Sequence, residues 1–285
     1  MNVEELFTLS PHGADTYVGV GPRYPWGGLY GGQIVAQALR AAAATVEPEL
    51  VPHSLRAYFI RRGDHTEPVR YEVDRIRNGK SFCTRRVVAR QAIGAVLNLE
   101  ASFQRLEPSV EIEAMQMSAD LPHPAELEQT SWTSMFDRAM IPPDQLPSEG
   151  FSGVGRAGMW AKINDPIGDD PLLHWCALAY MSDDLPCDAV IQAHPIGHEP
   201  KDEREDALMV ASLDHTIWFH RPFRADQWHL YDMACHSFVG SRGLSIGHVF
   251  TAGGVHVATV AQEVLMRDRR AQRADLSPGG DTVAR

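Results

Sequence analysis

The chain has 285 residues, a mass of 31.6 kDa and a hydrophobic fraction of 44%, enough for one large domain or two of ordinary size. Charged residues make up 22%, so the composition is that of a folded globular protein and excludes a disordered or fibrous chain. The 26 basic and 37 acidic residues give a net charge of −11, which argues against a dedicated nucleic-acid binder and against attachment to an anionic membrane surface.

No apolar run approaches the roughly 20 residues that are needed to cross a bilayer. The first five residues carry acids where a secretory signal carries bases. We therefore expect a cytoplasmic protein without membrane insertion. The cysteines form no CxxC pair and no zinc spacing, so we interpret them as small buried side chains rather than a disulfide framework or metal site: Cys83, Cys176, Cys187 and Cys235.

The first strong element is a helix from Gln33 to about Thr45, which is rich in helix formers and apolar on nearly every side. Two glycine pairs precede it within residues 24–32, where they allow a tight turn and a close backbone approach to a ligand or strand. Residues 69–73 and 97–103 then alternate with period two, which predicts strands that lay one face on a core. The helix is their natural partner.

Residues 106–150 contain scattered prolines and acids without a sustained period, which predicts a long linker with one short helix near residues 131–140. After it the earlier order of elements returns. We expect an apolar stretch at 159–163, a buried helix from Pro171 to Met181, and a strand at 255–261. From Arg267 onward the chain becomes charged and then rich in Gly, Pro and Ser, which predicts a flexible tail.

This recurrence has a fixed offset. Residues 58–61 (YFIR) match residues 218–221 (WFHR) at a distance of 160, since 218 − 58 = 160, and the same offset pairs Gly94 with Gly254 and Ser102 with Gln262. A repeat of this length is the size of a small domain plus its linker, so it indicates duplication. We expect the two halves to pack side by side as a pseudo-symmetric pair.

Several common sites are excluded by their spacing. Residues 150–154 and 239–243 both miss the GxSxG nucleophile elbow, no phosphate loop occurs, and residues 19–21 lack the third glycine of a dinucleotide fingerprint. His194 and His198 have the spacing of metal ligands, but Pro195 and Gly197 between them prevent one helix face from presenting both. We therefore expect no metal and no cofactor.

Two features point to chemistry at helix ends. The glycine-rich approach to the first helix can place backbone amides and the positive helix end against a carbonyl or oxyanion, which suggests acyl transfer. The second helix is followed by Asp183 and Asp184, where acids face the unfavourable end of the helix dipole. Such acids are placed either for function or to cap the next turn.

Five segments together resemble the acyl-CoA thioesterase II family over nearly the whole chain, from about residue 13 to 267: residues 27–33 (GGLYGGQ), 53–59 (HSLRAYF), 179–183 (AYMSD), 212–223 (SLDHTIWFHRPF) and 261–267 (AQEVLMR). The resemblance implies an α+β double hotdog, with two tandem repeats that each wrap a curved antiparallel sheet around a central helix. The expected parts are an N-terminal hotdog at 1–106, a linker at 107–150, a C-terminal hotdog at 151–267 and a flexible tail at 268–285.

The resemblance also implies a catalytic set of Asp183, Ser212 and Gln262, which would hold one water against the thioester carbonyl of a fatty acyl-CoA. Asp183 would act as the base, while the serine and glutamine would orient the water. Ser102 stands at the Gln262 position of the first half by the offset of 160, so we expect that half to have lost its chemistry.

The acyl-CoA substrate would meet the backbone amides of Gly31, Gly32 and Gln33, which we take as substrate-binding and candidate oxyanion donors. Its phosphates need local cations because the net charge is negative, and four arginines are candidates: Arg61, Arg62, Arg221 and Arg267. The family resemblance further suggests a homo-oligomer.

Two alternatives differ in their chemistry. A non-catalytic acyl-CoA-binding protein would keep the pocket without turnover. A hotdog hydratase or dehydratase would need an acid/base His–Asp pair, which His174 and Asp183 approximate only poorly, because nine residues put them on opposite faces of an ideal helix.

Overall fold

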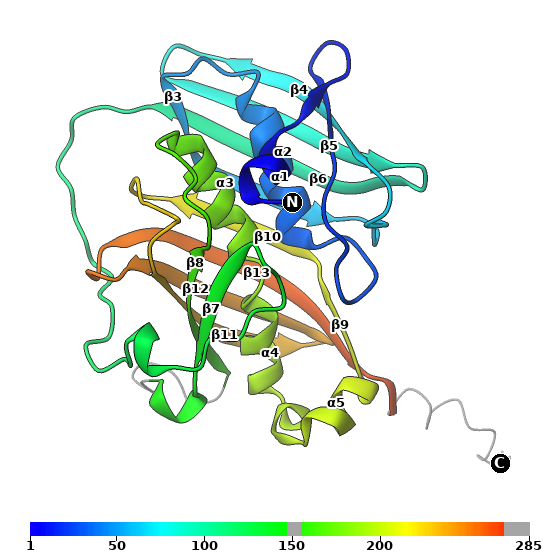
Figure 1. The fold of residues 1–285 in the computed structure, drawn as a ribbon, viewed down its shortest axis with the longest axis vertical. Helices are drawn as coiled ribbons and strands as arrows, with labels where there is room; N and C mark the ends of the chain where they lie inside the picture. Colours follow the sequence, from blue (N-terminus) through cyan, green and yellow to red (C-terminus); the bar gives the residue numbers. More distant parts are fainter. Residues whose placement is uncertain (147–154, 271–285) are drawn as a thin grey trace, which may run out of the picture.

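The computed structural model describes residues 1–146 and 155–270, and its main feature is a 13-stranded antiparallel sheet with helices packed against it (Figure 1). In chain order the strands are β1 (Ser10–Pro11), β2 (Thr16–Gly19), β3 (Leu50–Phe59), β4 (Val69–Asn78), β5 (Phe82–Gln91), β6 (Gly94–Arg105), β7 (Phe136–Ile141), β8 (Arg156–Ile163), β9 (Leu208–Ser212), β10 (Asp214–Phe219), β11 (His229–Val239), β12 (Arg242–Thr251) and β13 (His256–Asp268). The helices are α1 (Val3–Phe7), α2 (Gly31–Ala43), α3 (Pro171–Met181), α4 (Pro186–Ala193) and α5 (Lys201–Ala207), with short 3₁₀ turns η1 (Pro124–Glu126), η2 (Pro143–Gln145) and η3 (Pro195–His198).

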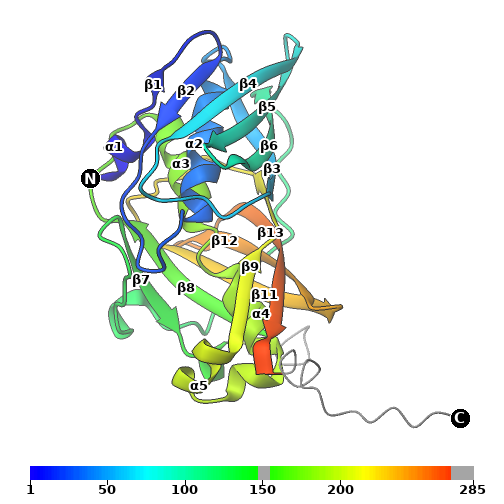
Figure 2. The ribbon, with the colours of Figure 1, turned by 90° about the vertical axis from the view of Figure 1, so that its right-hand side faces the viewer.

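The sheet consists of two halves in mirrored order. Strands β1-β2-β4-β5-β6-β3 from the first part of the chain are followed by β10-β13-β12-β11-β8-β7 from the second, and β9 pairs beside β13. Each half brings its own helix against its own strands, α2 in the first and α4 in the second. Among the described strands, the two halves of the sheet are joined by the pairing of β3 with β10. Figure 2 shows the strands of the first half above those of the second.

The β3–β10 pairing supports the predicted duplication. Arg56 lies opposite Thr216, and these two residues differ by 216 − 56 = 160, which is the repeat offset. On either side of it, Ser54 pairs with Trp218 and Tyr58 pairs with Asp214. The offset of 160 converts one of these pairs into the other, since 214 − 54 = 160 and 218 − 58 = 160. The contact is therefore self-complementary, as in a two-fold symmetric dimer.

Both predicted long helices form: α3 has the predicted bounds, whereas α2 begins at Gly31 and ends at Ala43, two residues earlier than predicted at each end. α2 and α3 lie side by side and run antiparallel. The start of α2 contacts the end of α3, where the Tyr30 hydroxyl donates to the Tyr180 carbonyl at 2.8 Å, and at the other end Arg40 pairs with Asp170. α3 is buried along almost its whole length, as its apolar composition requires. The strands predicted at 69–73 and 97–103 fall within β4 and β6, and the one predicted at 255–261 overlaps β13 from residue 256.

The predicted helix near residues 131–140 is wrong. Residues 136–141 form strand β7, which pairs with β8 so that Ala139 lies opposite Trp160. The edge of the second half-sheet supplies a hydrogen-bonding ladder that local propensity cannot reveal, and it overrides a weak helical pattern. β7 thus belongs to the second half-sheet, although it falls within the segment expected to be a linker.

The end of the chain is described only as far as residue 270. β13 continues to Asp268, while most of the predicted tail, residues 271–285, lies outside the described residues. None of the described helices is both long and apolar enough to span a bilayer.

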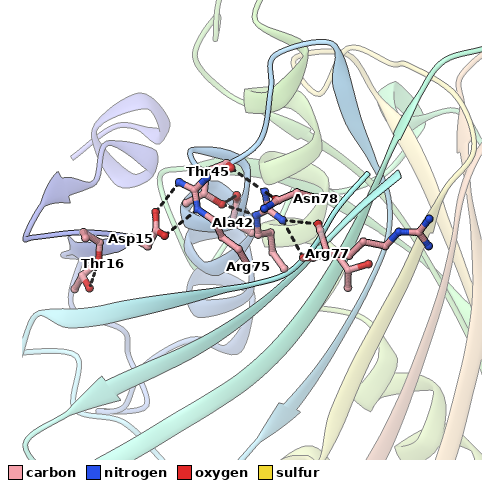
Figure 3. Close-up of polar contacts among 10 residues, drawn as sticks. Asp15, Thr16, Ala42, Thr45, Arg75, Arg77 and Asn78 are labelled. Atoms are coloured by element: carbon pink, nitrogen blue, oxygen red, sulfur yellow. Dashed lines mark hydrogen bonds and ion pairs between the residues drawn. The ribbon is translucent and has the colours of Figure 1, made fainter. Parts of the chain in front are cut away.

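A buried arginine ties the first half-sheet to the end of α2. Arg85 is 2% exposed, and its guanidinium donates to the Thr45 hydroxyl and carbonyl, the Asn78 amide oxygen, and the carbonyls of Arg77 and Thr84, at 2.7 to 3.0 Å. Figure 3 shows Thr45, Arg77 and Asn78 gathered at this helix end. A cation at the C-terminal end of a helix also meets the negative end of its dipole.

We predict that Arg85→Met lowers the free energy of unfolding by about 3 kcal/mol, because it removes five hydrogen bonds and leaves buried acceptors without donors. Urea unfolding followed by circular dichroism measures this. The matched control is Arg86→Met at the next position of β5, whose exposed side chain donates to Asn98 and whose loss should cost under about 0.5 kcal/mol. Equal losses in the two variants would contradict the structural role of Arg85.

Candidate functional site

The site centres on Asp183, which lies in the break between α3 and α4. The side chain is 8% exposed, and its Oδ2 accepts a hydrogen bond from the Gly32 amide at 2.9 Å. Gly32 is in the first turn of α2, whose N-cap Tyr30 provides no side-chain cap. The carboxylate therefore caps a helix of the other half, at the positive end of that helix dipole, instead of the next turn of its own chain.

The other two predicted catalytic residues lie beside this carboxylate. Ser212 ends β9, and its hydroxyl donates to Asp183 Oδ1 at 3.5 Å. Gln262 lies on the neighbouring strand β13, and its Nε2 donates to the Ser212 hydroxyl oxygen at 2.8 Å. The structure thus brings together three side chains that are 29 to 79 positions apart in the sequence, since 212 − 183 = 29 and 262 − 183 = 79.

The sequence analysis missed a fourth member of this network, His215. Its Nδ1 lies 2.5 Å from Gln262 Oε1 and its Nε2 lies 2.8 Å from the Ser182 hydroxyl. An amide oxygen only accepts, so Nδ1 carries the proton. His215 is fully buried, and burial lowers its pKa to about 4, so the ring is neutral near pH 7. His215 is the fourth residue of the segment 212–223 and lies in strand β10. A polar side chain within a strand could have marked it as a candidate site residue.

The donors of this network all point one way. His215 donates to Gln262, the Gln262 amide nitrogen donates to Ser212, and the Ser212 hydroxyl is then free to donate toward Asp183. Because the histidine fixes which end of the Gln262 carboxamide faces Ser212, it sets the direction of the remaining hydrogen bonds. The chain of donors ends on the carboxylate.

The pKa of Asp183 is raised to about 7. Burial is the main cause, and the nearby Asp184 carboxylate adds to it, while the Gly32 amide, Gln262 and Ser212 act in the opposite direction. Asp184 itself accepts hydrogen bonds from the Trp132 indole at 2.7 Å and the Arg138 guanidinium at 2.8 Å. Asp183 is therefore poised to exchange a proton near neutral pH.

The predicted substrate-binding residues separate into two groups. Gly31 and Gly32 border the carboxylate, and a Cβ on Gly31 would approach Asp183 Oδ2 to 2.5 Å, so only glycine fits there. The Gln33 side chain points elsewhere: it is fully buried and accepts from the Tyr24 hydroxyl at 2.7 Å. What Gln33 can offer to this site is its backbone amide, in a helix turn whose first N–H groups have no intrahelical acceptor.

Ser102 is not the counterpart of Gln262, contrary to the sequence prediction. In β5–β6 Arg85 pairs with Ala101, and in β12–β13 Ser245 pairs with Gln262, where 245 − 85 = 160. The counterpart is therefore Ala101. The second hairpin is one residue longer, since Arg90 pairs with Ala95 (95 − 90 = 5) whereas Phe250 pairs with His256 (256 − 250 = 6).

Ser102 consequently faces the other side of the sheet from Ala101 and contacts His53 Nε2 at 2.8 Å. This removes it from the helix-facing side of the first half.

The His–Asp pair that a hydratase would need is absent from the described residues around this site. His174 accepts the Ala225 amide at Nδ1, at 3.0 Å, and its Nε2 lies 3.1 Å from the Gly168 carbonyl. Both ring nitrogens of His174 thus form hydrogen bonds with backbone groups, which connect the helix to the loops at Gly168 and Ala225. Cys187 does border the site, 3.8 Å from both Ser212 Oγ and Gln262 Nε2, but burial raises its pKa to about 12 and keeps the thiol neutral.

Comparisons with known proteins match both halves of the chain. The family model for the acyl-CoA thioesterase N-terminal domain matches residues 21–104, and that for the acyl-CoA thioesterase C-terminal domain matches residues 113–266. Acyl-coenzyme A thioesterase 8 of Mus musculus is 34% identical, covering 93% of this chain and 88% of its own.

Solved structures agree. An acyl-CoA thioesterase II, TesB2, from Mycobacterium marinum has a TM-score of 0.80 and 36% identity, covering 98% of this chain and 99% of its own. A protein with a hot dog fold from Alicyclobacillus acidocaldarius has a TM-score of 0.70 at 19% identity, covering 93% and 97% of the two chains, which is a likeness of fold alone. The fold is therefore a hotdog fold of the α+β class.

We predict that Asp183→Asn stabilises the protein more at pH 8 than at pH 5. The folded-state pKa of about 7 lies above the ordinary value of 3.8, so the wild type loses stability as rising pH removes the proton through 7. The advantage of the neutral variant should grow by up to about 3 kcal/mol over this interval. Urea unfolding at the two pH values measures it, and a pH-independent difference would show that the carboxyl titrates normally.

Proposed function

The chain belongs to the acyl-CoA thioesterase II family, and we propose that it hydrolyses fatty acyl-CoA to a free fatty acid and CoA through a water held by Asp183, Ser212 and Gln262. One observation carries the proposal. The buried Asp183 carboxylate is held at the N-terminus of α2 by one oxygen, while its other oxygen faces the Ser212–Gln262 pair.

The reaction follows from what each group can do. A water bound between Asp183, Ser212 and Gln262 gives a proton to the carboxylate as its oxygen attacks the thioester carbon. The tetrahedral intermediate then collapses, the carbon–sulfur bond breaks, and the leaving thiolate takes the proton back from Asp183. A pKa of about 7 suits both transfers, because the group must accept a proton and then release it near neutral pH.

The developing oxyanion needs donors that do not titrate. The first turn of α2 supplies backbone amides at the positive end of the helix dipole, and those of Gly31 and Gln33 are our candidates because the Gly32 amide already serves Asp183. Of the three predicted substrate-binding residues, Gly32 thus holds the base through its amide, while Gly31 and Gln33 would donate to the substrate.

A covalent acyl-serine route has less support. The histidine near the site, His215, bonds Gln262 and Ser182 rather than Ser212, so it does not take the Ser212 proton. Ser212 accepts a hydrogen bond from Gln262 and faces a carboxylate, which suits a group that orients water.

We propose two tandem hotdogs with the parts 1–106, 107–150, 151–267 and 268–285, with β7 from the linker segment completing the second sheet. For CoA, Arg62 is the best placed of the four candidate arginines, since it is exposed and donates to the Trp26 carbonyl in the turn that leads into α2. A cytoplasmic location and a homo-oligomer complete the proposal.

The function is tested by thiol release from acyl-CoAs of several chain lengths. Asp183→Asn should lower kcat by at least about 100-fold with KM little changed, because a base acts in the transition state. The wild-type kcat should fall below pH 7, where the carboxylate becomes protonated. The control Ser102→Ala, on the other face of the sheet, should keep full activity. Tight acyl-CoA binding without thiol release from any chain length would instead favour the non-catalytic binder.

The role of His215 as a positioning residue gives a separate prediction. His215→Leu removes the donor that orients the Gln262 carboxamide, so kcat should fall by roughly 10- to 100-fold at constant KM. His215→Asn can keep a donor near the Nδ1 position and should recover most of that loss. If both variants lose activity equally while remaining folded by circular dichroism, orientation of Gln262 is not what His215 provides.

A further inference from the structure

A cavity lies at the opposite end of the α2–α3 pair from Asp183. It has a volume of about 550 Å³ and lies among α1, the C-terminal end of α2, the start of β3 and the N-terminal end of α3. Its lining is mostly apolar and includes Phe7, Leu9, Val46, Pro52 and Trp175, with Arg40 as the cation. This volume is within the range of small-molecule sites.

The cavity occupies in the first half the place that the candidate active site occupies in the second. Each site lies where the C-terminal end of one helix meets the N-terminal end of the other, next to the start of an inner strand. Pro52 is the third residue of β3 and corresponds to Ser212, the last residue of β9, by the offset that the β3–β10 pairing obeys, since 212 − 52 = 160. The two sites are pseudo-symmetric counterparts.

The first-half site lacks the hydroxyl and the amide of the proposed chemistry at the corresponding positions. Pro52 has no hydroxyl where the second half has Ser212, and Ala101 has no amide where it has Gln262. The charged side chain from the C-terminal end of the helix is Arg40, where the second half has a carboxylate. An arginine stays protonated in proteins, so it is not a base. The cavity therefore offers none of the three groups of the proposed chemistry at the corresponding positions, and its cation, Arg40, lies at the same cavity as the carboxylates of Glu47 and Asp170.

Arg40 is only weakly engaged. Among the described residues its ion-pair partner is Asp170, whose Oδ2 lies 3.7 Å from Nη1, and the two side chains are 33% and 49% exposed. Exposed ion pairs of this kind contribute about 0 to 1 kcal/mol. Asp170 also caps α3 by accepting the Leu172 amide at 3.0 Å, which holds it in place. The guanidinium therefore has donors left for a second carboxylate, which it can bind in bidentate form.

We propose that this cavity binds a free fatty acid, with the alkyl chain against the apolar lining and the carboxylate on Arg40. Glu47 and Asp170 at the same cavity disfavour the phosphates of CoA, so the site selects the free acid over the acyl-CoA. It is a binding site without hydrolysis, and it stands whether or not the second half is the active site.

Quenching of Trp175 by a brominated fatty acid tests the proposal on the full chain. 11-Bromoundecanoate should quench part of the tryptophan emission, and Trp175→Phe should remove that component while the other five tryptophans remain. Arg40→Gln should raise the Kd of the bromo acid, measured by quenching of Trp175, by about tenfold. The alcohol 11-bromo-1-undecanol, which lacks the carboxylate, should bind the wild type as weakly as the bromo acid binds Arg40→Gln. The matched control Arg70→Gln, an exposed arginine paired with Glu72 on β4, should change nothing.

Three results would overturn the proposal: quenching that Trp175→Phe leaves intact, equal affinity of wild type and Arg40→Gln, or displacement of the bromo acid from Trp175 by the non-hydrolysable thioether S-undecyl-CoA. The last would mean that the cavity takes acyl-CoA instead. None of these readouts depends on thiol release, so failure here is distinguishable from failure of the proposed hydrolysis.

Discussion

The contact between the Asp183 carboxylate and the Gly32 amide joins the two halves at the candidate active site. At the end of its own helix the carboxylate meets the negative end of the dipole, whereas at the start of α2 it meets the positive end. Because α2 and α3 pack antiparallel, the Asp183 carboxylate at the end of α3 also lies at the start of α2. Burial then raises the pKa of the carboxyl and the amide limits that rise, so the group titrates near neutral pH instead of remaining an ordinary acid or a permanently protonated one.

The surrounding structure maintains this contact from both sides. The self-complementary β3–β10 pairing fixes the two half-sheets relative to each other, and the hydrogen bond from the Tyr30 hydroxyl to the Tyr180 carbonyl fixes the adjoining helix ends. Asp184, next in the chain, is anchored by Trp132 and Arg138. A hydrogen bond at 2.9 Å between elements so distant in sequence requires this support, because small displacements of either helix would break it.

Much of the site was predictable because its signals are local. The bounds of α3 follow from an apolar run that starts at a proline, and Asp183 stands out as an acid at the wrong end of a helix. Non-local pairing explains the errors. The ladder offered by β8 decides that residues 136–141 form a strand, and one extra residue in the β12–β13 hairpin moves the counterpart of Gln262 from Ser102 to Ala101. His215 needed the fold, because only its contact with Gln262 gives it a role.

The same packing explains why the halves diverged in chemistry but kept their shape. A buried hydroxyl, amide and carboxylate are stable only as a set, since removing one leaves the others without partners. At the corresponding positions of the first half, the apolar residues Pro52 and Ala101 avoid the desolvation cost that an incomplete polar set would carry. The cavity itself persists because its walls are α2, α3 and β3, the elements that the intact site at the other end also requires. If the candidate site is the active site, its packing constrains the shape of the counterpart cavity while leaving the polarity of that cavity free to change.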